Sequence, residues 1–472
     1  MTSSLKIAPG PREVDSISTL LAAGAISLLI ASGIAIALHP IAGIAAVFAS
    51  FLVFALLWPT ITPLACLFTI VAAHSQYLLP TVPGLGQDGV QKVLLVALVG
   101  VLLLREHKRF SLTATLAVLL FGSFAVYGVL FAPSASGIDQ ATLFRALIGF
   151  SFAWIVLFVR LTPKDARTML FAIAALPAVS LAYGVGLRVL GYSALFQDEY
   201  TGVIRLSGAS IPAHLAMLSF VGVVAGLAYG IVFRESTIST AMVILNILVC
   251  CASLTRGAIS ATVVLLATYV FAIWILQRRK SPGVFISSVS LKQTRAGLYG
   301  FGLVLIAGVA IFPLLMQRSR STALEQGFNS SGRDEAWSFY FDQFSAHPAF
   351  GNGLGFASVA NEILKPTGVQ SAFRAPHNEY LHFLVDVGLI GSIGLAVIMV
   401  VGLIRLVRKM TSPVMIGLIL AVALSVVVYA YFDNIFSTPQ FLLPMLLTLM
   451  CIRSVSGRCL GEECNAEPVR GV

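Results

Sequence analysis

The chain has 472 residues, of which 58% are hydrophobic and 11% are charged, and its formal net charge is +10. A soluble globular domain carries about 25% charged residues, so this composition excludes that class and indicates a protein embedded in a lipid bilayer. The basic residues do not form a face interleaved with aromatic residues, so their excess does not indicate a nucleic-acid partner.

Apolar stretches long enough to cross a bilayer follow one another along most of the chain. A transmembrane helix needs about 20 apolar residues, because its backbone N–H and C=O groups must be bonded internally in the hydrocarbon core. The pattern predicts an all-α, polytopic membrane protein of about 14 transmembrane helices, or about 12 if two short ones are re-entrant or merge. The first stretch is too long for the apolar part of a cleavable signal peptide, and no small-residue cleavage site ends it. The predicted spans are 17–38, 41–59, 60–74, 90–104, 111–131, 142–160, 167–190, 211–233, 238–254, 257–276, 297–316, 383–404, 413–433 and 440–453.

The basic residues predict the orientation of these spans. With a cytoplasmic N-terminus, the inner segments hold 20 of the 30 Lys and Arg residues, in agreement with the positive-inside rule. Residues 1–16 and 454–472 are then cytoplasmic tails of a membrane domain that covers residues 17–453. We therefore predict a multi-pass membrane protein whose single large loop, 317–382, faces the outer side of the membrane.

The large loop is expected to contain short helices, because an unstructured loop of such length is uncommon in a compact protein. Residues 333–346 have the spacing of an amphipathic helix. A glycine-rich turn follows at 351–355, and a second helix is expected to start at His377, directly after Pro376. The aromatic side chains expected on one face of the first helix are Trp337, Tyr340, Phe341 and Phe344.

Several signatures of catalysis and ligand binding are missing from the sequence. It contains no Gly-Lys dipeptide and therefore no P-loop, and no Asp-x-Asp motif for a metal-held nucleotide sugar. Four of the six cysteines lie in apolar stretches, and the remaining pair, Cys459 and Cys464, lacks the four ligands of a structural zinc site. We expect neither a cofactor nor a bound metal.

Four arginines fall on the predicted outer side of the membrane, where basic residues are scarce: Arg205, Arg256, Arg333 and Arg374. Arg256 lies at a tight corner between two apolar spans, where a charge usually serves a pathway or a ligand; a side chain that reaches to the interface is the alternative. Arg333 opens the helix 333–346, where a bound anion would offset its clash with the helix dipole. A salt bridge to an acidic neighbour is the alternative there. Arg205 either lines the same cavity or caps its loop.

His377, in the sequence Arg-Ala-Pro-His-Asn-Glu-Tyr, is the candidate general base. A histidine titrates near pH 6.5 when unperturbed, so the side chain type can accept a proton at periplasmic pH. A structural role at the membrane interface is the alternative, and the neighbouring outer arginines favour the catalytic one. His382 points to another part of the helix and is the weaker candidate.

The region from Thr255 to Gly391 resembles the signature region of the O-antigen ligase and polymerase family. Each matching piece is weak by itself, but their order and their common side of the membrane make the combination specific. Asp386 stands where the family often has glutamate, at a position that we interpret as structural. The matching pieces are Thr255-Arg256-Gly257, Gly332-Arg333, Trp337, Pro348, Gly351, Gly353, Gly355, Pro376-His377-Asn378, Leu381 and Asp386-x-Gly388-Leu389-x-Gly391.

The resemblance implies a GT-C-like glycosyltransferase of the bacterial inner membrane with an inverting, metal-independent reaction. Its active site would be carried by the loop 317–382 and would face the periplasm. Its donor would be a glycan linked to undecaprenyl diphosphate, and its acceptor lipid A–core or a second lipid-linked glycan. Arg256 and Arg333 would bind the donor diphosphate, and His377 would be the general base. These residue types suit the chemistry, because the arginine fork matches phosphate oxygens and histidine can take the proton of an attacking hydroxyl. The other predicted substrate-binding residues are Arg205, Arg374, Asn378 and Trp337.

Three functions remain open at this point. A ligase transfers finished O-antigen to lipid A–core, whereas a polymerase joins lipid-linked repeat units; the long loop with its His-Asn motif favours the ligase. A transporter or flippase of the lipid-linked glycan belongs to another class. Transporters usually bind their substrate at the midplane, between inverted repeats. This sequence shows no repeat, and its charged groups gather at the outer surface.

Overall fold

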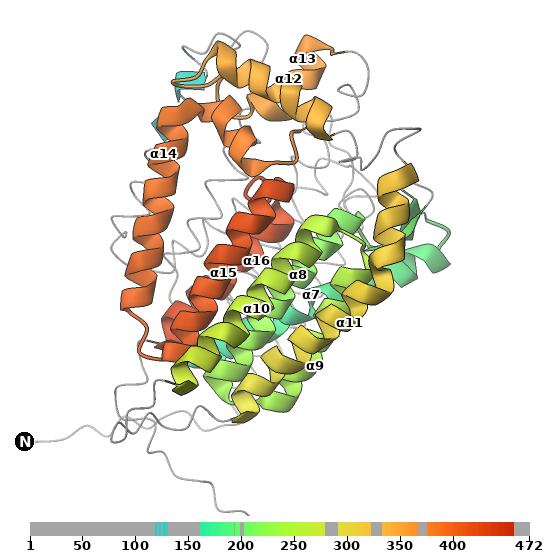
Figure 1. Cartoon of the computed structure of the whole chain (residues 1–472), viewed down its shortest axis with the longest axis vertical. Coiled ribbons are helices and arrows are strands. Elements are labelled where there is room, and N and C mark those ends of the chain that lie inside the picture. The colour runs from blue at the N-terminus through green and yellow to red at the C-terminus, as the bar shows by residue number, and fades with distance from the viewer. Residues whose placement is uncertain are drawn as a thin grey trace, which may run out of the picture.

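In the computed structural model, long helices form a bundle and a layer of short helices lies across one end of it (Figure 1). The structure describes residues 161–192, 194–198, 203–278, 291–321, 333–366 and 375–456, with isolated residues between 119 and 130. The predicted spans before residue 111, the span 142–160, the N-terminal tail and most of the C-terminal tail lie outside these residues. Within the predicted span 111–131, the residues that are described are helical.

In the described ranges, every predicted span coincides with a helix. Six of these helices are long and apolar enough to cross a membrane, while α9 and α16 are shorter apolar helices. The expectation of an all-α, multi-pass membrane protein is therefore confirmed. The helices are α7 (Pro163–Val189), α8 (Pro212–Phe233), α9 (Ser236–Ala252), α10 (Arg256–Arg278), α11 (Leu291–Ser321), α14 (Glu379–Arg408), α15 (Pro413–Phe432) and α16 (Pro439–Ser456).

Local sequence signals set the ends of several helices. The Thr162 side chain accepts a hydrogen bond from the Asp165 amide at the start of α7. At the start of α15, the Ser412 side chain accepts one from the Met415 amide. In both helices proline is the first helical residue, a position at which its missing N–H is harmless. Arg234 ends α8 in the left-handed conformation, as is common at helix C-termini.

The centre of the bundle is α8, which packs against α7, α9 and α16. Phe220 on α8 stacks on Phe441 of α16, with ring centroids 6.0 Å apart. Gly222 allows α9 to approach closely, because a Cβ at this position would lie 2.4 Å from the Asn246 side-chain oxygen. The Asn246 amide in turn donates to the Ala174 carbonyl of α7 at 2.9 Å. Small residues and side-chain hydrogen bonds of this kind hold helices together in lipid.

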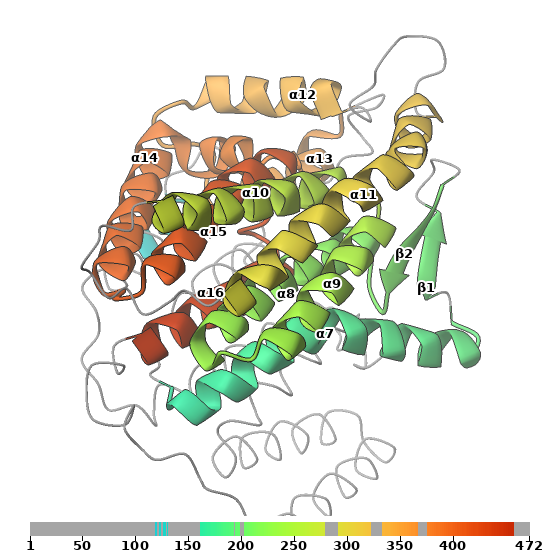
Figure 2. The same cartoon turned by 60° about the horizontal axis from the view of Figure 1, so that its bottom comes forward.

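An antiparallel hairpin interrupts the helical architecture of the described residues. Its strands are β1 (Leu195–Asp198) and β2 (Ile204–Gly208), and Gln197 pairs with Arg205. Figure 2 shows the hairpin beside the ends of the bundle helices, and β2 contacts α7, α8 and α9. The sequence analysis did not predict these strands, because two short strands give no hydropathy signal next to long apolar spans.

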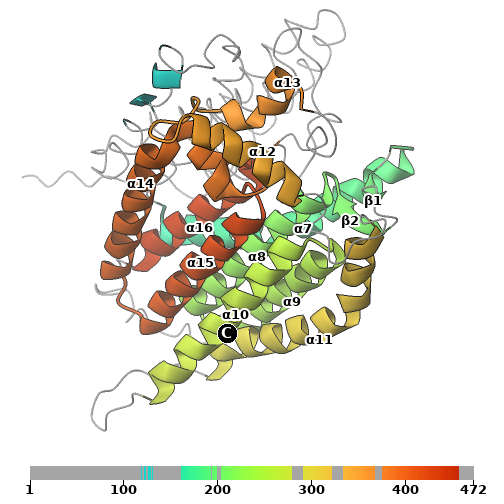
Figure 3. The same ribbon diagram turned by 45° about the horizontal axis from the view of Figure 1, so that its top comes forward.

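The outer layer consists of α12 (Arg333–Ala346), the short helix η4 (Phe356–Ser358) and α13 (Ala360–Leu364), and Figure 3 shows it over the end of the bundle. The expectation that Phe341 lies on the buried face of α12 is wrong, because this side chain is 55% exposed. Phe339 takes its place beside Tyr340, so the buried face is rotated from the predicted one. The small core of the layer comprises Phe339, Tyr340, Phe356, Ala357, Ala360, Leu381 and Val385, with Trp337, Phe344 and Ile363 packed against it.

A loop of the outer layer is inserted into a break in α14. The break lies at Gly388, which has φ 65° and ψ −172°. Two backbone amides after the break and two backbone carbonyls before it would pair with each other in an uninterrupted helix. In α14 they bond instead to residues 348–353. The replacing bonds are Leu389 N to Pro348 O (2.9 Å), Ile390 N to Ala349 O (3.1 Å), Asn352 N to Val385 O (2.8 Å) and Gly353 N to Asp386 O (2.9 Å).

Candidate functional site

The candidate site lies where the N-termini of α10 and α12 meet the C-terminal end of α15. Arg333, the first residue of α12, donates from Nη1 to the carbonyl of Phe432 at 2.8 Å. Gly257 of α10 packs against the same residue, since a Cβ at this glycine would lie 2.7 Å from the Phe432 Cβ. Arg256 is the first residue of α10. The fold therefore brings the starts of two arginine-bearing helices to one point, although they are far apart in the sequence.

His377 lies at the same end of α15. Its Nδ1 is 3.1 Å from Oδ1 of Asp433, the residue that follows α15, and its side chain is 41% exposed. The expectation that His377 starts the next helix is wrong. The helix α14 begins at Glu379, because the Asn378 side chain accepts hydrogen bonds from the amides of Tyr380 and Leu381 and acts as its N-cap. His377 instead has a left-handed conformation with φ 48°.

The electrostatics of the pair favour a charged carboxylate. Burial by itself raises the pKa of Asp433, but the hydrogen bond and charge of His377, with the charge of Arg333, outweigh it and hold that pKa below its ordinary value. An ionised carboxylate can only accept hydrogen bonds, so Nδ1 of His377 carries the proton in this contact. Asp433 thus fixes the tautomer and the orientation of the imidazole ring.

Hydrogen bonds on both sides hold the backbone around His377. The indole Nε1 of Trp337 donates to the Pro376 carbonyl at 2.7 Å. On the other side, the backbone N–H of Asn378 donates to the Asn434 side-chain oxygen at 3.1 Å. A left-handed conformation is uncommon for a residue other than glycine, and such conformations persist only where the surroundings enforce them. Trp337 and Asn378, two predicted site residues, therefore fix the backbone on either side of His377.

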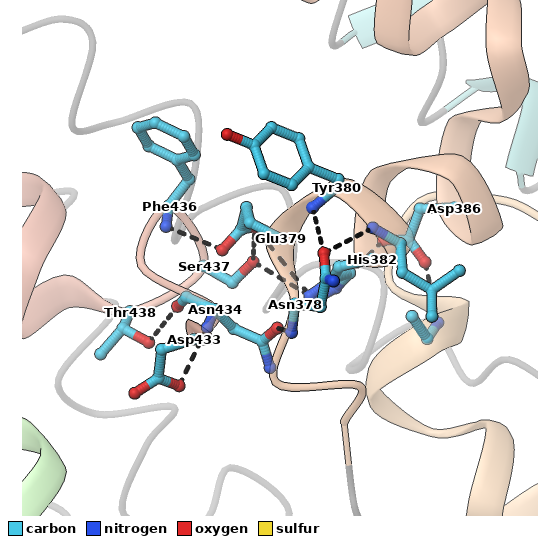
Figure 4. A network of polar contacts seen from close by, with 12 residues as sticks. Asn378, Glu379, Tyr380, His382, Asp386, Asp433, Asn434, Phe436, Ser437 and Thr438 are labelled. Carbon is cyan, nitrogen blue, oxygen red and sulfur yellow. Dashed lines mark hydrogen bonds and ion pairs between the residues drawn. The ribbon is translucent and has the colours of Figure 1, made fainter. Parts of the chain in front are cut away.

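A second polar network lies next to the site, on the first turns of α14 (Figure 4). The buried carboxylate of Glu379 accepts from the Phe436 amide at 3.0 Å and from the Ser437 hydroxyl at 2.9 Å. His382 is also buried, and its Nε2 is 3.5 Å from Oδ2 of Asp386. Glu379 thus fixes the segment after Asn434, while His382 lies inside the fold rather than at the site.

Asp386 connects this network to the outer layer. Its two carboxylate oxygens accept hydrogen bonds from the amides of Gly355 and Ala357, both at 2.8 Å. These amides belong to the glycine-rich turn and to the start of η4, so the carboxylate fixes the loop that enters the break in α14. Among the described residues, no group of three or more His, Cys, Asp or Glu side chains is arranged to hold a metal.

Arg205, another predicted site residue, does not join the exposed part of the site. Arg205 is 2% exposed and lies under the turn between α9 and α10. It donates from Nε to the Ser253 carbonyl and from Nη2 to the Thr255 hydroxyl, both at 2.8 Å. Arg374 lies outside the described residues.

The sequence analysis missed Asp433, Asn434 and Glu379. A signal for the first two is present, because Asp433 and Asn434 stand at the end of an apolar span and are the first strongly polar residues after it. An acidic group at such a position needs a partner or a role. For Glu379 the signal is weaker, since a glutamate after a helix N-cap is ordinary and its burial depends on the packing of residues 436 and 437.

The all-α fold, with six described helices long and apolar enough to cross a bilayer, is that of a multi-pass membrane protein. Residues 241–396, a third of the chain, match the family model described as O-antigen ligase. This region, which runs from α9 into α14, is similar to the O-antigen ligase family. The matched region contains Arg256, Arg333 and His377. No curated protein matches the sequence.

Proposed function

We propose that the protein transfers O-antigen from an undecaprenyl diphosphate-linked donor to lipid A–core at the periplasmic face of the bacterial inner membrane. The observation that supports this proposal is that Arg333, His377 and the helix start that carries Arg256 converge on the Phe432–Asp433 end of α15. In this proposal the arginines bind a diphosphate, and the histidine beside them is the base. The proposed reaction is inverting and metal-independent.

In this proposal Arg256 and Arg333 hold the diphosphate of the donor. Negative charge develops on the diphosphate as it leaves, and arginine neutralises it through two parallel N–H groups on the phosphate oxygens. Arg333 is the first residue of α12. The first backbone N–H groups of a helix also attract anions, so they would assist Arg333 in binding the diphosphate. Arg374, shortly before His377 in the sequence, is a further candidate for contacts with the donor.

His377 acts as the general base toward the acceptor. Nδ1 faces Asp433, so Nε2 on the other side of the ring receives the proton of the acceptor hydroxyl. The hydroxyl oxygen forms a bond to the anomeric carbon while the bond from that carbon to the diphosphate oxygen breaks. One displacement of this kind inverts the anomeric configuration. Undecaprenyl diphosphate leaves, and the protonated imidazole, stabilised by Asp433, returns its proton to water.

Trp337 and Asn378 serve the base rather than the substrate in this scheme. Their hydrogen bonds to the Pro376 carbonyl and the Asn434 side chain hold His377 in its left-handed conformation. A base that is held in one position lowers the barrier, because less orientational freedom is lost in the transition state.

The proposal is tested with the purified protein, a lipid-linked O-antigen and lipid A–core in separate and combined assays. Ligation predicts a glycan–lipid A product that forms only when both substrates are present. Elongation of the donor by its own repeat units would identify the polymerase reaction at the same site. Movement of the lipid-linked glycan across a vesicle membrane, without a new glycosidic bond, would contradict the proposed transfer and indicate a flippase.

A further inference from the structure

The strand β2 places an arginine under the turn that carries Arg256. Arg205 is almost fully buried, at 2% exposed, and two nitrogens of its guanidinium are bonded within the protein. Nε donates to the Ser253 carbonyl and Nη2 to the Thr255 hydroxyl, each at 2.8 Å. Ser253 caps the C-terminus of α9, and Arg256 starts α10. The guanidinium thus connects the end of one helix to the residue that precedes the other.

The turn itself has an unfavourable backbone conformation. Leu254, between the two residues that Arg205 contacts, has φ 51° and is 4% exposed. Leucine rarely adopts the left-handed region, because its Cβ approaches the following carbonyl oxygen too closely. A strained residue persists where other contacts fix it. Both contacts from Arg205 flank Leu254, and the Ser253 hydroxyl adds a bond to the Cys250 carbonyl at 2.6 Å.

The geometry points to Arg205 as a positioning residue: the β1–β2 hairpin holds the α9–α10 turn in its left-handed form, so that Arg256 starts α10 against the end of α15. This inference rests on the proposed function, in which Arg256 binds the donor. It differs from the expectation that Arg205 binds the substrate itself. The start of α10 has little freedom to move, because Gly257 already packs on Phe432 without space for a Cβ. A small change in the turn therefore displaces Arg256, which directly precedes Gly257, relative to the end of α15.

The kinetic test is a double-mutant cycle between Arg205 and Arg256. Arg205→Met is expected to raise the donor KM by up to about 10²-fold, the loss that a displacement of about 1 Å can cause, with a smaller change in kcat. Because Arg205 acts through Arg256, adding Arg205→Met to Arg256→Ala is expected to cause little further loss. Losses that multiply would show that Arg205 contacts the donor directly and would overturn the inference. If Arg205→Met fails to insert, Arg205→Lys provides the same cycle, since it keeps the charge and loses the fork.

The structural test needs no substrate. Glycine adopts the left-handed conformation without strain, so Arg205→Met is expected to lower the thermal unfolding temperature less in a Leu254→Gly background than beside Leu254. Equal losses in both backgrounds would overturn the inference. The two tests also separate it from the proposed function. If Arg256→Ala leaves transfer unchanged, the donor role of Arg256 fails, whereas the coupling between Arg205 and Leu254 is still decided by unfolding.

Discussion

Gly351 and Gly388 lie against each other where the glycine-rich loop enters the break in α14. A Cβ on Gly351 would lie 2.6 Å from the Gly388 nitrogen, and a Cβ on Gly388 would lie 2.5 Å from the Gly351 nitrogen. Both residues have positive φ, 70° and 65°. Only glycine combines this conformation with this approach. The contact sets how the first turns of α14, which follow His377, are placed relative to the rest of the helix.

We expect Gly388→Ala to destabilise the protein by at least about 1–3 kcal/mol, because alanine adds a clash with the Ala349 carbonyl to a strained backbone. The matched control is Gly402→Ala in the same helix, where nothing lies within 4 Å of the added Cβ. Thermal unfolding of both variants in the same detergent measures the difference. Equal unfolding temperatures would mean that the loop does not insert into α14 as described.

The general base is tested best by His377→Asn. Asparagine tolerates the left-handed conformation of this position better than alanine does, so the change removes the imidazole while the backbone is kept. Transfer is expected to fall about 10²- to 10⁴-fold, mainly in kcat, with normal insertion and donor binding.

The control for this variant is His347→Asn, directly after the last residue of α12. It is expected to keep near wild-type transfer. His382 is not a suitable control, because it is buried in the network with Asp386 and its replacement would also disturb the fold. Retained activity in His377→Asn would remove this residue from the mechanism.

Much of the fold is predictable from the sequence, because long apolar runs in lipid have few alternatives to helices. The spans from residue 163 onward and the helix at 333–346 have nearly the predicted limits. The hairpin and the break in α14 were not predicted. Both depend on long-range contacts, such as Arg205 with Ser253 and Gly351 with Gly388, which leave no periodic signal in either segment.

The candidate site was predicted only in part, because the sequence shows single polar groups but not which distant segments the fold brings together. Arg256, Arg333 and His377 are predictable because they are basic groups on the predicted outer side of the membrane, and the fold brings the segments that carry them to one point. Asp433 was not predicted, because its contact with His377 joins two segments that are far apart in the sequence. The buried position of Arg205 could not be deduced, because it depends on the strand pairing with Gln197 and on the turn above it.

Asp433→Asn is expected to lower kcat, because the amide cannot fix the tautomer and orientation of the His377 imidazole as the ionised carboxylate does. The pKa of Asp433 is below its ordinary value, so this carboxylate stays charged well into the acidic range and is fully ionised at neutral pH, where transfer is measured. Asp342→Asn, at an exposed position of α12, is the control and should leave kcat unchanged. An unchanged kcat in Asp433→Asn would contradict the assigned role.

The arginine sites are tested by separating charge from geometry. A lysine keeps the positive charge but loses the planar fork that binds two phosphate oxygens. For Arg256 and Arg333, the lysine variant is expected to bind the donor more weakly than wild type and more tightly than the alanine variant. Direct binding of a lipid-linked glycan in nanodiscs gives this order, with Lys365→Ala as a control at an exposed basic position. Lysine variants that bind no better than alanine variants would indicate a structural role for these arginines.

The absence of a metal requirement is the most direct consequence of assigning diphosphate neutralisation to arginines. With Arg256 and Arg333 on the leaving group, a divalent cation has no necessary part in stabilising its charge, so excess EDTA is expected to leave the initial rate of transfer unchanged. The assay uses purified protein and a lipid-linked donor, first treated with EDTA and then supplied with magnesium. A rate that EDTA abolishes and magnesium restores would show that a metal neutralises the diphosphate. In that case the Arg→Ala variants should lose stability rather than donor binding, and the two measurements together would decide which groups carry the charge of the leaving group.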